Sequence, residues 1–274
     1  MSVSESVAAP ATTVAAVLAE TWLLAESLAR FGVRLPARRP EQFSPGVELP
    51  LRIRLGGPIS LHARLRCDQA DEFGVALSVA GLGWQARFRA SVAHTESGAR
   101  LRCALSGVPA TVQATVSERL LGALVVAVRA RAQQLVGAPL VVGTAIVADG
   151  AVLAAQRERP AALAGRWEFP GGRVEAGEDE PRAVIRECQE ELGATVRVLG
   201  RLGPDLILPS GWLLRIHAAE LVDGQRPAAL EHRSLRWVRA AELDALHWID
   251  ADRAVLPALR ALLARQAKAA VVRR

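Results

Sequence analysis

The chain has 274 residues, of which 51% are hydrophobic, and its formal net charge is +6. This length suggests two domains of ordinary size, each able to bury a core. The three cysteines, Cys67, Cys103 and Cys188, suit neither a disulfide framework nor a zinc site, which favours a reducing compartment. No basic region precedes the first apolar stretch, and no apolar run is long enough for a membrane span. We therefore expect a cytoplasmic protein that does not engage a membrane.

The first half of the chain changes its hydrophobic period twice. Residues 11–31 carry apolar side chains at helical spacing, and Gly32 ends that run. Three later runs alternate apolar and polar residues, as half-buried antiparallel strands do: 61–67, 84–92 and 99–106. Residues 117–136 open with a serine cap and continue as an amphipathic helix. The predicted order is helix, strands and long helix.

That order, with the opening "VAAPATTVAAVLAETW", resembles the helix-grip fold of the START-like (SRPBCC) superfamily. The resemblance implies an α+β domain over residues 1–136, in which a long C-terminal helix lies across a curved antiparallel sheet. Eight arginines occupy the polar phase of the expected strands: Arg52, Arg54, Arg64, Arg66, Arg87, Arg89, Arg100 and Arg102. They indicate either a solvated face or a surface for nucleic acid or another polyanion. The START-like resemblance adds a third option, a pocket for a small apolar ligand.

The second half begins after a short linker at residues 137–139. Two β-rich runs meet at Asp149-Gly150, a dipeptide typical of tight hairpins. Further strands are expected near residues 196–199, 212–221 and 235–238, and a final helix near 254–267. Strands that alternate with helices predict a mixed α/β domain over residues 140–274.

Between these elements lies an acidic segment with glycines on both sides. Asp179, Glu180 and Pro181 predict the start of a helix, and Gly193 predicts its end. Glu187, Glu190 and Glu191 then project from one side of that helix. Like charges so close together destabilise a helix unless a cation lies between them, and Mg²⁺ prefers carboxylate oxygens. The segment therefore predicts a magnesium site.

The same residues resemble the Nudix box, G-x5-E-x7-R-E-U-x-E-E-x-G-U, in which U is usually a bulky aliphatic residue. Gly172 and Glu178 match its first fixed positions, and residues 186–194, "RECQEELGA", match the rest. Cys188 and Ala194 are small for U positions, which concerns packing rather than chemistry. The resemblance implies a Nudix α/β/α sandwich with a mixed sheet that hydrolyses a nucleoside diphosphate linked to another group. A solvated acidic helix explains neither the glycines nor Arg186.

The Nudix resemblance also assigns roles to residues. Mg²⁺, or Mn²⁺ as a substitute, would be held by the carbonyl of Gly171 and by Glu187, Glu190, Glu191 and Glu231. Arg186 would orient Glu178, and Glu231 would complete the metal cluster or deprotonate water. The expected catalytic residues are thus Glu178, Arg186, Glu187, Glu190 and Glu231, with the identity of the general base left open.

"WEFPGG", just before the box, resembles the MutT-like nucleoside triphosphate pyrophosphohydrolases, and the likeness extends over residues 141–262. It implies release of nucleoside monophosphate and pyrophosphate. Phe169 would stack on the base, Arg157 would contact base or phosphate, and Asp252 falls where bacterial MutT-type enzymes read the base with asparagine. The plain alternatives are a core position for Phe169 and a surface pair for Arg157 and Asp252.

Several substrates stay open. An ionised carboxylate at Asp252 accepts hydrogen bonds but cannot donate them, so oxidised guanine such as that of 8-oxo-dGTP, cytosine derivatives and adenine derivatives all remain. Other Nudix substrates are CTP or methylated dCTP, ADP-ribose and dinucleotides. A different class would be a nucleotide sensor that binds without cleavage. Because every glutamate of the box is present, the sequence favours catalysis.

Overall fold

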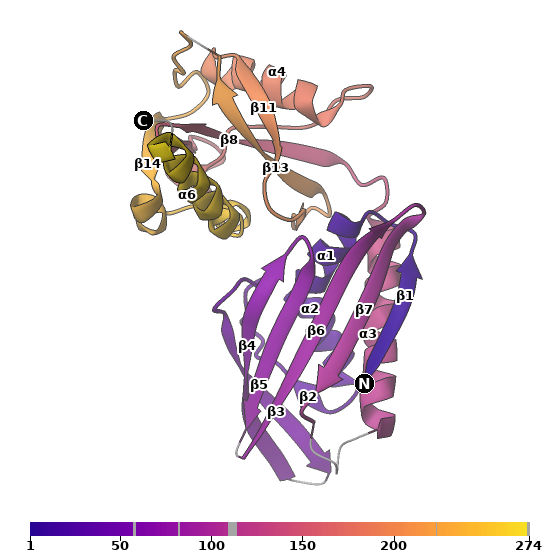
Figure 1. Cartoon of the computed structure of the whole chain (residues 1–274). Coiled ribbons are helices and arrows are strands. Elements are labelled where there is room, and N and C mark those ends of the chain that lie inside the picture. The colour runs from indigo at the N-terminus through magenta and orange to yellow at the C-terminus, as the bar shows by residue number, and fades with distance from the viewer. Residues whose placement is uncertain (57–58, 82, 109–113, 223, 273–274) are drawn as a thin grey trace. The chain divides into compact units, whose positions relative to one another are not determined.

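The computed structural model describes residues 1–56, 59–81, 83–108, 114–222 and 224–272. The chain divides into two compact units, Met1–Gly137 and Ala138–Arg274 (Figure 1). In the described parts, no helix combines the length and the apolar character that crossing a lipid bilayer requires.

The first unit is built on one curled antiparallel sheet with the strand order β1-β7-β6-β5-β4-β3-β2 (Figure 1). Its strands are β1 (Ser2–Val7), β2 (Val33–Arg34), β3 (Glu48–Gly56), β4 (Ile59–Asp71), β5 (Gly74–Gly81), β6 (Trp84–Thr95) and β7 (Gly98–Ser106). The three runs predicted from their alternation are confirmed as parts of β4, β6 and β7. β1 was not predicted, because its serine-rich sequence has little apolar signal, but it pairs along its whole length with β7.

Three helices cover one face of this sheet: α1 (Ala11–Ala19), α2 (Thr21–Ala29) and α3 (Ala114–Gln134). The single helix predicted for residues 11–31 is wrong in one respect, since Glu20 adopts an extended conformation and breaks it. Glu20 is buried, and its carboxylate accepts two hydrogen bonds from Arg131 of α3. At the break the backbone of Glu20 forms an antiparallel bridge with Gln42, so two long-range contacts accompany the extended conformation. The helix-grip assignment of residues 1–136 stays a prediction.

The second unit contains a mixed sheet with the strand order β10-β9-β8-β13-β11. In addition, β12 pairs with β13 and β14 pairs with β9. Its strands are β8 (Leu140–Ala148), β9 (Ala151–Gln156), β10 (Trp167–Glu168), β11 (Val196–Arg201), β12 (Leu206–Ile207), β13 (Leu213–Leu221) and β14 (Ser234–Arg239). β8 and β13 run parallel, and the other pairs are antiparallel. The predicted hairpin at Asp149-Gly150 is confirmed, with both residues at positive φ.

Helices cover both faces of this mixed sheet. α4 (Glu180–Leu192) packs on one face over an apolar cluster that includes Val142, Ile146 and Val184. The other face is covered by the 3-10 turn at Ala240–Ala245, the short helix α5 (Asp250–Arg253) and the final helix α6 (Leu256–Val272) around Trp248. The layers are therefore helix, sheet and helix, and the central strand β8 carries buried residues from Val142 to Val147.

An ionic cluster that the sequence did not indicate fixes the first turn of α4 to the sheet. The Arg215 guanidinium on β13 donates to Glu180 of α4 and, through two nitrogens at 3.1 and 3.2 Å, to the fully buried carboxylate of Asp205. Nε2 of His217 lies 2.9 Å from the Glu180 carboxylate. The hydrogen bond with His217 and the charge of Arg215 outweigh burial and lower the pKa of Glu180 to about 2.

Replacing Glu180 with Gln should therefore lower the free energy of unfolding by about 3 kcal/mol at pH 7, since one pKa unit corresponds to about 1.4 kcal/mol. Because the folded-state pKa lies below the usual value, the contribution is complete above about pH 4.5 and disappears as the pH falls towards 2. Denaturant unfolding of both proteins from pH 7 to pH 3 measures the shrinking difference. The exposed Glu158→Gln variant serves as control, and equal losses for both variants would contradict the prediction.

All three cysteines are free thiols in the cores of the two units. Cys67 and Cys103 lie in the first unit, and Cys188 lies on the sheet-facing side of α4. Burial is the main cause that raises the pKa of each thiol to about 12. All three therefore serve as small core residues.

Candidate active site

The acidic helix α4 begins and ends where the sequence predicts. Asp179 caps its N-terminus, and the carboxylate accepts a 2.9 Å hydrogen bond from the Arg182 N–H. At the other end Gly193 has φ 61°, and its N–H returns to the carbonyls of Cys188 and Gln189. These signals are local, so the bounds of the helix can be predicted from the sequence alone.

The paired glycines before the helix are required by close packing. Gly171 has φ 154°, and a Cβ there would overlap the carbonyl oxygen of Val142 on β8. A Cβ on Gly172 would instead overlap the carboxylate of Glu187, 2.5 Å from its Cδ. The Gly171 N–H donates a 2.8 Å hydrogen bond to Glu191. The glycine loop therefore lies directly against two glutamates of α4.

Arg186 is the centre of the carboxylate cluster. Its guanidinium donates to both oxygens of Glu178, each at 3.0 Å, and to the carbonyl of Arg173 at 2.8 Å. The remaining terminal nitrogen lies 2.8 Å from Glu187 and 3.1 Å from Glu190. One positive charge thus serves three carboxylates, which leaves the cluster with a net negative charge.

The environment gives these carboxyl groups different proton affinities. Arg186 lowers the pKa of Glu178 through a charge-assisted hydrogen bond. Burial raises the pKa of Glu187, and burial raises that of Glu191 to about 7 despite the nearby charge of His232. Buried carboxylates that repel one another become easier to deprotonate when a cation approaches.

In the described part of the chain, no three His, Cys, Asp or Glu side chains are already gathered around a point that could hold a metal ion. A metal cation was predicted between these glutamates, but in the structure the Arg186 guanidinium lies between Glu187 and Glu190 and donates to both. The donor set nevertheless fits a hard divalent ion, because the cluster offers carboxylate oxygens in excess of positive charge. A hollow of about 470 Å³ beside it is lined by Glu178, Arg182, Ile185, Arg186, Gln189 and Glu190.

Glu231, predicted as a further ligand or base, is exposed. No described hydrogen bond or ion pair joins it to the box glutamates, and its role stays a prediction. The neighbouring residue His232 is buried instead, and its Nε2 lies 3.4 Å from the buried carboxylate of Glu168. Although burial alone would lower it, the hydrogen bond to Glu168 and the charge of Glu191 raise the pKa of His232.

The residues predicted to contact the base lie at the ends of β9 and β10 and in α5. Phe169 is buried and packs on Trp248, with ring centroids 5.0 Å apart. Arg157 forms an ion pair with Glu168. Asp252 is buried rather than at the surface, and its carboxyl group accepts a hydrogen bond from the Phe169 N–H. Burial, followed by the charge of Glu168, raises the pKa of Asp252 well above its usual value.

Glu168 and His232 were not predicted as site residues. They connect the predicted base-contacting residues to Glu191, which in turn accepts from Gly171. Glu168 belongs to the quoted "WEFPGG" motif, so its position was visible, but its role depends on partners that are distant in the chain. His232 carries no spacing signal of its own.

Known proteins are similar to the second unit of the chain. The NUDIX domain family model matches residues 138–259. A Mycobacterium tuberculosis protein named putative 8-oxo-dGTP diphosphatase 2 is 50% identical over 117 residues, which cover 42% of this chain and 82% of that protein. The chain belongs to the Nudix family.

Two further matches come from Escherichia coli, one from a comparison of sequences and one from a comparison of structures. CTP pyrophosphohydrolase is 36% identical over 125 residues, which cover 45% of this chain and 93% of that protein. The solution structure of the ORF135 protein shares 35% identity at a TM-score of 0.40, covering 45% of this chain and 89% of that one. As a Nudix protein, the chain is a hydrolase that acts on phosphoanhydride bonds, and Nudix hydrolases generally need a divalent metal.

Proposed function

We propose that the protein hydrolyses nucleoside triphosphates, including oxidised ones such as 8-oxo-dGTP, to nucleoside monophosphate and pyrophosphate with Mg²⁺. Water substitutes at the β-phosphorus, and the bond from that phosphorus to the oxygen bridging to the α-phosphate breaks. The observation that supports this most directly is the cluster on Arg186, where Glu178, Glu187 and Glu190 gather against the glycine loop.

In this proposal the residues of the box have separate tasks. Glu187, Glu190, Glu191 and the Gly171 carbonyl would hold the metal, with Glu231 as a further ligand or as the base. When bound, a divalent cation neutralises charge on the triphosphate and lowers the pKa of a bound water. Arg186 positions Glu178 and Glu187 through four hydrogen bonds to side chains and backbone, so their carboxylates are oriented before substrate arrives.

Asp252 could recognise the base in its protonated, uncharged form. With a pKa well above its usual value, the carboxyl group retains its proton at higher pH than an exposed Asp, and it can then donate as well as accept hydrogen bonds. Cytosine presents an acceptor nitrogen beside an amino group, which matches such a pair. This observation and the CTP pyrophosphohydrolase relative favour cytidine triphosphates as the second candidate substrate.

A panel of normal and oxidised nucleoside triphosphates with Mg²⁺ tests the proposal, with pyrophosphate and orthophosphate measured separately. We expect pyrophosphate release, and tight nucleotide binding without release would support a sensor instead. Asp252→Asn retains an acceptor for the Phe169 N–H but changes the donors that face a base. It should therefore alter the relative kcat/KM of at least two nucleotides by about 10-fold, the equivalent of one hydrogen bond. An unchanged ranking would remove Asp252 from base recognition.

A further inference from the structure

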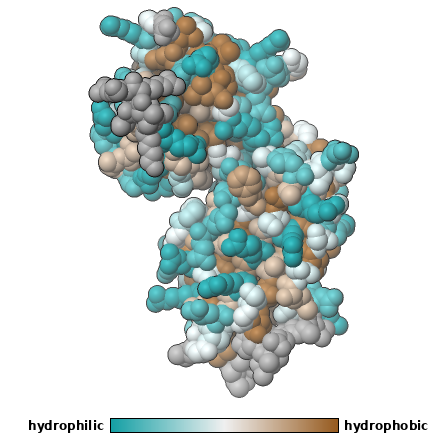
Figure 2. Space-filling model, in the orientation of Figure 1, coloured by the Kyte–Doolittle hydropathy of each residue, from teal (hydrophilic) through white to brown (hydrophobic). Residues whose placement is uncertain are grey.

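The outer face of the first unit, opposite its helices, gathers the eight arginines that the alternation placed on one side. The strand register confirms this arrangement, because Arg87 of β6 lies opposite Ser78 of β5, which lies opposite Arg66 of β4. We call this surface the arginine face: Arg52, Arg54, Arg64, Arg66, Arg87, Arg89, Arg100 and Arg102. All eight are exposed. In Figure 1 the helices of the first unit lie behind its sheet, so the outer face of the sheet is turned to the viewer. Figure 2 has the same orientation and shows hydrophilic groups spread over that face.

Most of these arginines have no acidic partner among the residues that the structure describes. Within the described residues, the ion pair on this face joins Arg66 to Asp68 at 3.6 Å, and Arg52 donates to the Ser60 hydroxyl. Carboxylates described on the same face belong to Glu48, Asp68 and Asp71. Arg52 also lies directly opposite Arg34 of β2, and directly opposed like charges destabilise a sheet. The face therefore has an excess of positive charge that the unit itself does not neutralise.

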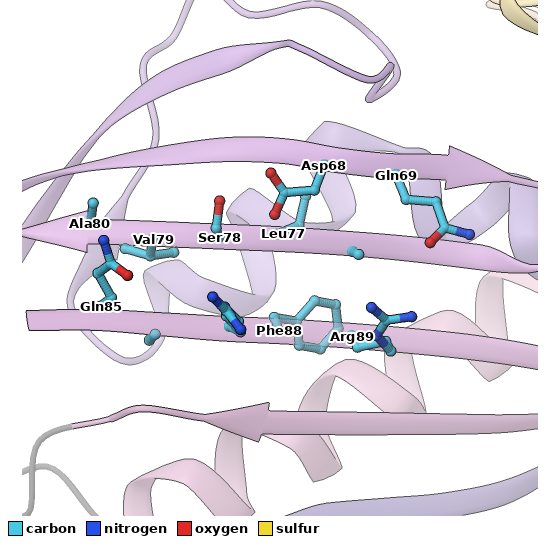
Figure 3. A pocket seen from close by; sticks show the side chains of 12 residues that line it. Asp68, Gln69, Leu77, Ser78, Val79, Ala80, Gln85, Phe88 and Arg89 are labelled. Carbon is cyan, nitrogen blue, oxygen red and sulfur yellow. The ribbon is translucent and has the colours of Figure 1, made fainter.

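The arginine face contains a hollow. This hollow of about 450 Å³ runs along β5, where the outward residues are the small Ala76, Ser78 and Ala80 (Figure 3). Arg87 and Arg89 of β6 border it on one side, and Asp68 and Gln69 of β4 border it on the other. Because neighbouring strands lie about 4.8 Å apart, β4 and β6 stand roughly 10 Å from each other. A phosphodiester strand could lie over the small residues of β5, between Arg87 of β6 and Arg66 of β4, which both lie opposite Ser78. The Asp68 carboxylate at the β4 border is paired with Arg66.

We propose that the arginine face binds the phosphate backbone of double-stranded nucleic acid without reading its sequence. Arginine matches phosphate in charge and geometry, and the Ser78 hydroxyl of the floor can donate to a phosphate oxygen. Single-strand binding surfaces stack bases on aromatic rings, but Trp84 and Phe88 of β6 belong to the opposite phase, towards the helices. An anionic membrane would favour apolar anchors among the cations, whereas the floor here is alanine and serine.

Fluorescence anisotropy of a labelled mixed-sequence DNA duplex with the full chain tests this proposal. Affinity should fall steeply between about 50 mM and about 200 mM salt, because bound phosphates release counterions. The variant Arg64→Ser/Arg87→Ser/Arg89→Ser removes three cations that lie opposite small residues of β5. Its slope of log affinity against log salt should be shallower by about 2.7, since each phosphate contact contributes about 0.9.

The matched control is Arg30→Ser/Arg38→Ser/Arg119→Ser, which removes the same charge from exposed positions outside the sheet. It should keep the wild-type slope. Both variants should also keep the wild-type circular dichroism spectrum and thermal unfolding curve, which shows that the substituted first unit still folds. Equal losses in both variants, tighter binding of the single strand than of the duplex, or binding of phosphatidylserine vesicles but not of DNA would each overturn the proposal. So would a wild-type protein that binds no duplex at low salt.

Discussion

Glu190→Gln should reduce kcat for pyrophosphate release by at least about 100-fold, while the protein stays folded. Loss of one preorganised charged group at a reacting phosphate costs on the order of 10²–10³ in rate. The side chain of Glu190 is 53% exposed and contributes one of the hydrogen bonds on Arg186, so the free energy of unfolding should change by less than about 0.5 kcal/mol. Steady-state kinetics with saturating Mg²⁺, together with a melting curve, measure both quantities.

Glu175→Gln is the matched control for this variant. Glu175 is an exposed carboxylate in the same loop, at a position where the Nudix box fixes no residue. It should retain the wild-type rate. If Glu190→Gln also kept full turnover, the carboxylate cluster on Arg186 could not be the centre of the reaction.

Gly172→Ala should lower kcat by about 100-fold through displacement of Glu187 alone. The new methyl group would occupy the space that the Glu187 carboxylate fills. Glu187 can rotate away at little cost to the fold, but it then loses its 2.8 Å hydrogen bond to Arg186. A shift of about 1 Å in a catalytic group can cost 10²-fold in rate. Kinetics and thermal unfolding of the same sample separate the two effects.

Gly122→Ala provides the comparison, because its Cβ would meet no atom within 4 Å in the middle of α3. There the methyl group should add up to about 1 kcal/mol of stability and leave hydrolysis unchanged. Gly172→Ala would contradict the packing argument if it retained wild-type kcat, or if it unfolded the protein before affecting the site.

The parts that the sequence predicts well are those determined by near neighbours. Asp179 and Gly193 bound α4 through contacts within a few residues, and Asp149-Gly150 closes a hairpin by its own backbone preferences. The alternation of arginine with apolar residues likewise needs only the pleat of a strand, so the arginine face could be predicted before its register was known.

Contacts between distant segments could not be predicted in this way. Glu20, where the predicted helix breaks, forms a backbone bridge with Gln42 and an ion pair with Arg131, which lies 111 residues later. Glu180 is 37 residues from His217, and no spacing rule relates them. Asp252 looks like a surface carboxylate in the sequence, and its burial against the Phe169 backbone changes both its proton affinity and its hydrogen-bonding capacity. Such pairs become visible only when the chain is folded.

The burial of the three thiols lowers their reactivity towards oxidants. Peroxides attack the thiolate, and with a pKa of about 12 only roughly one molecule in 10⁵ carries a thiolate at each cysteine near neutral pH. The chain has a single methionine, Met1, so its one readily accessible sulfur lies at the N-terminus, far along the chain from the Nudix box. In the second unit the one sulfur atom, that of Cys188, is therefore both buried and held as the unreactive thiol, which protects it from the steps that lead to sulfenic and sulfinic acids.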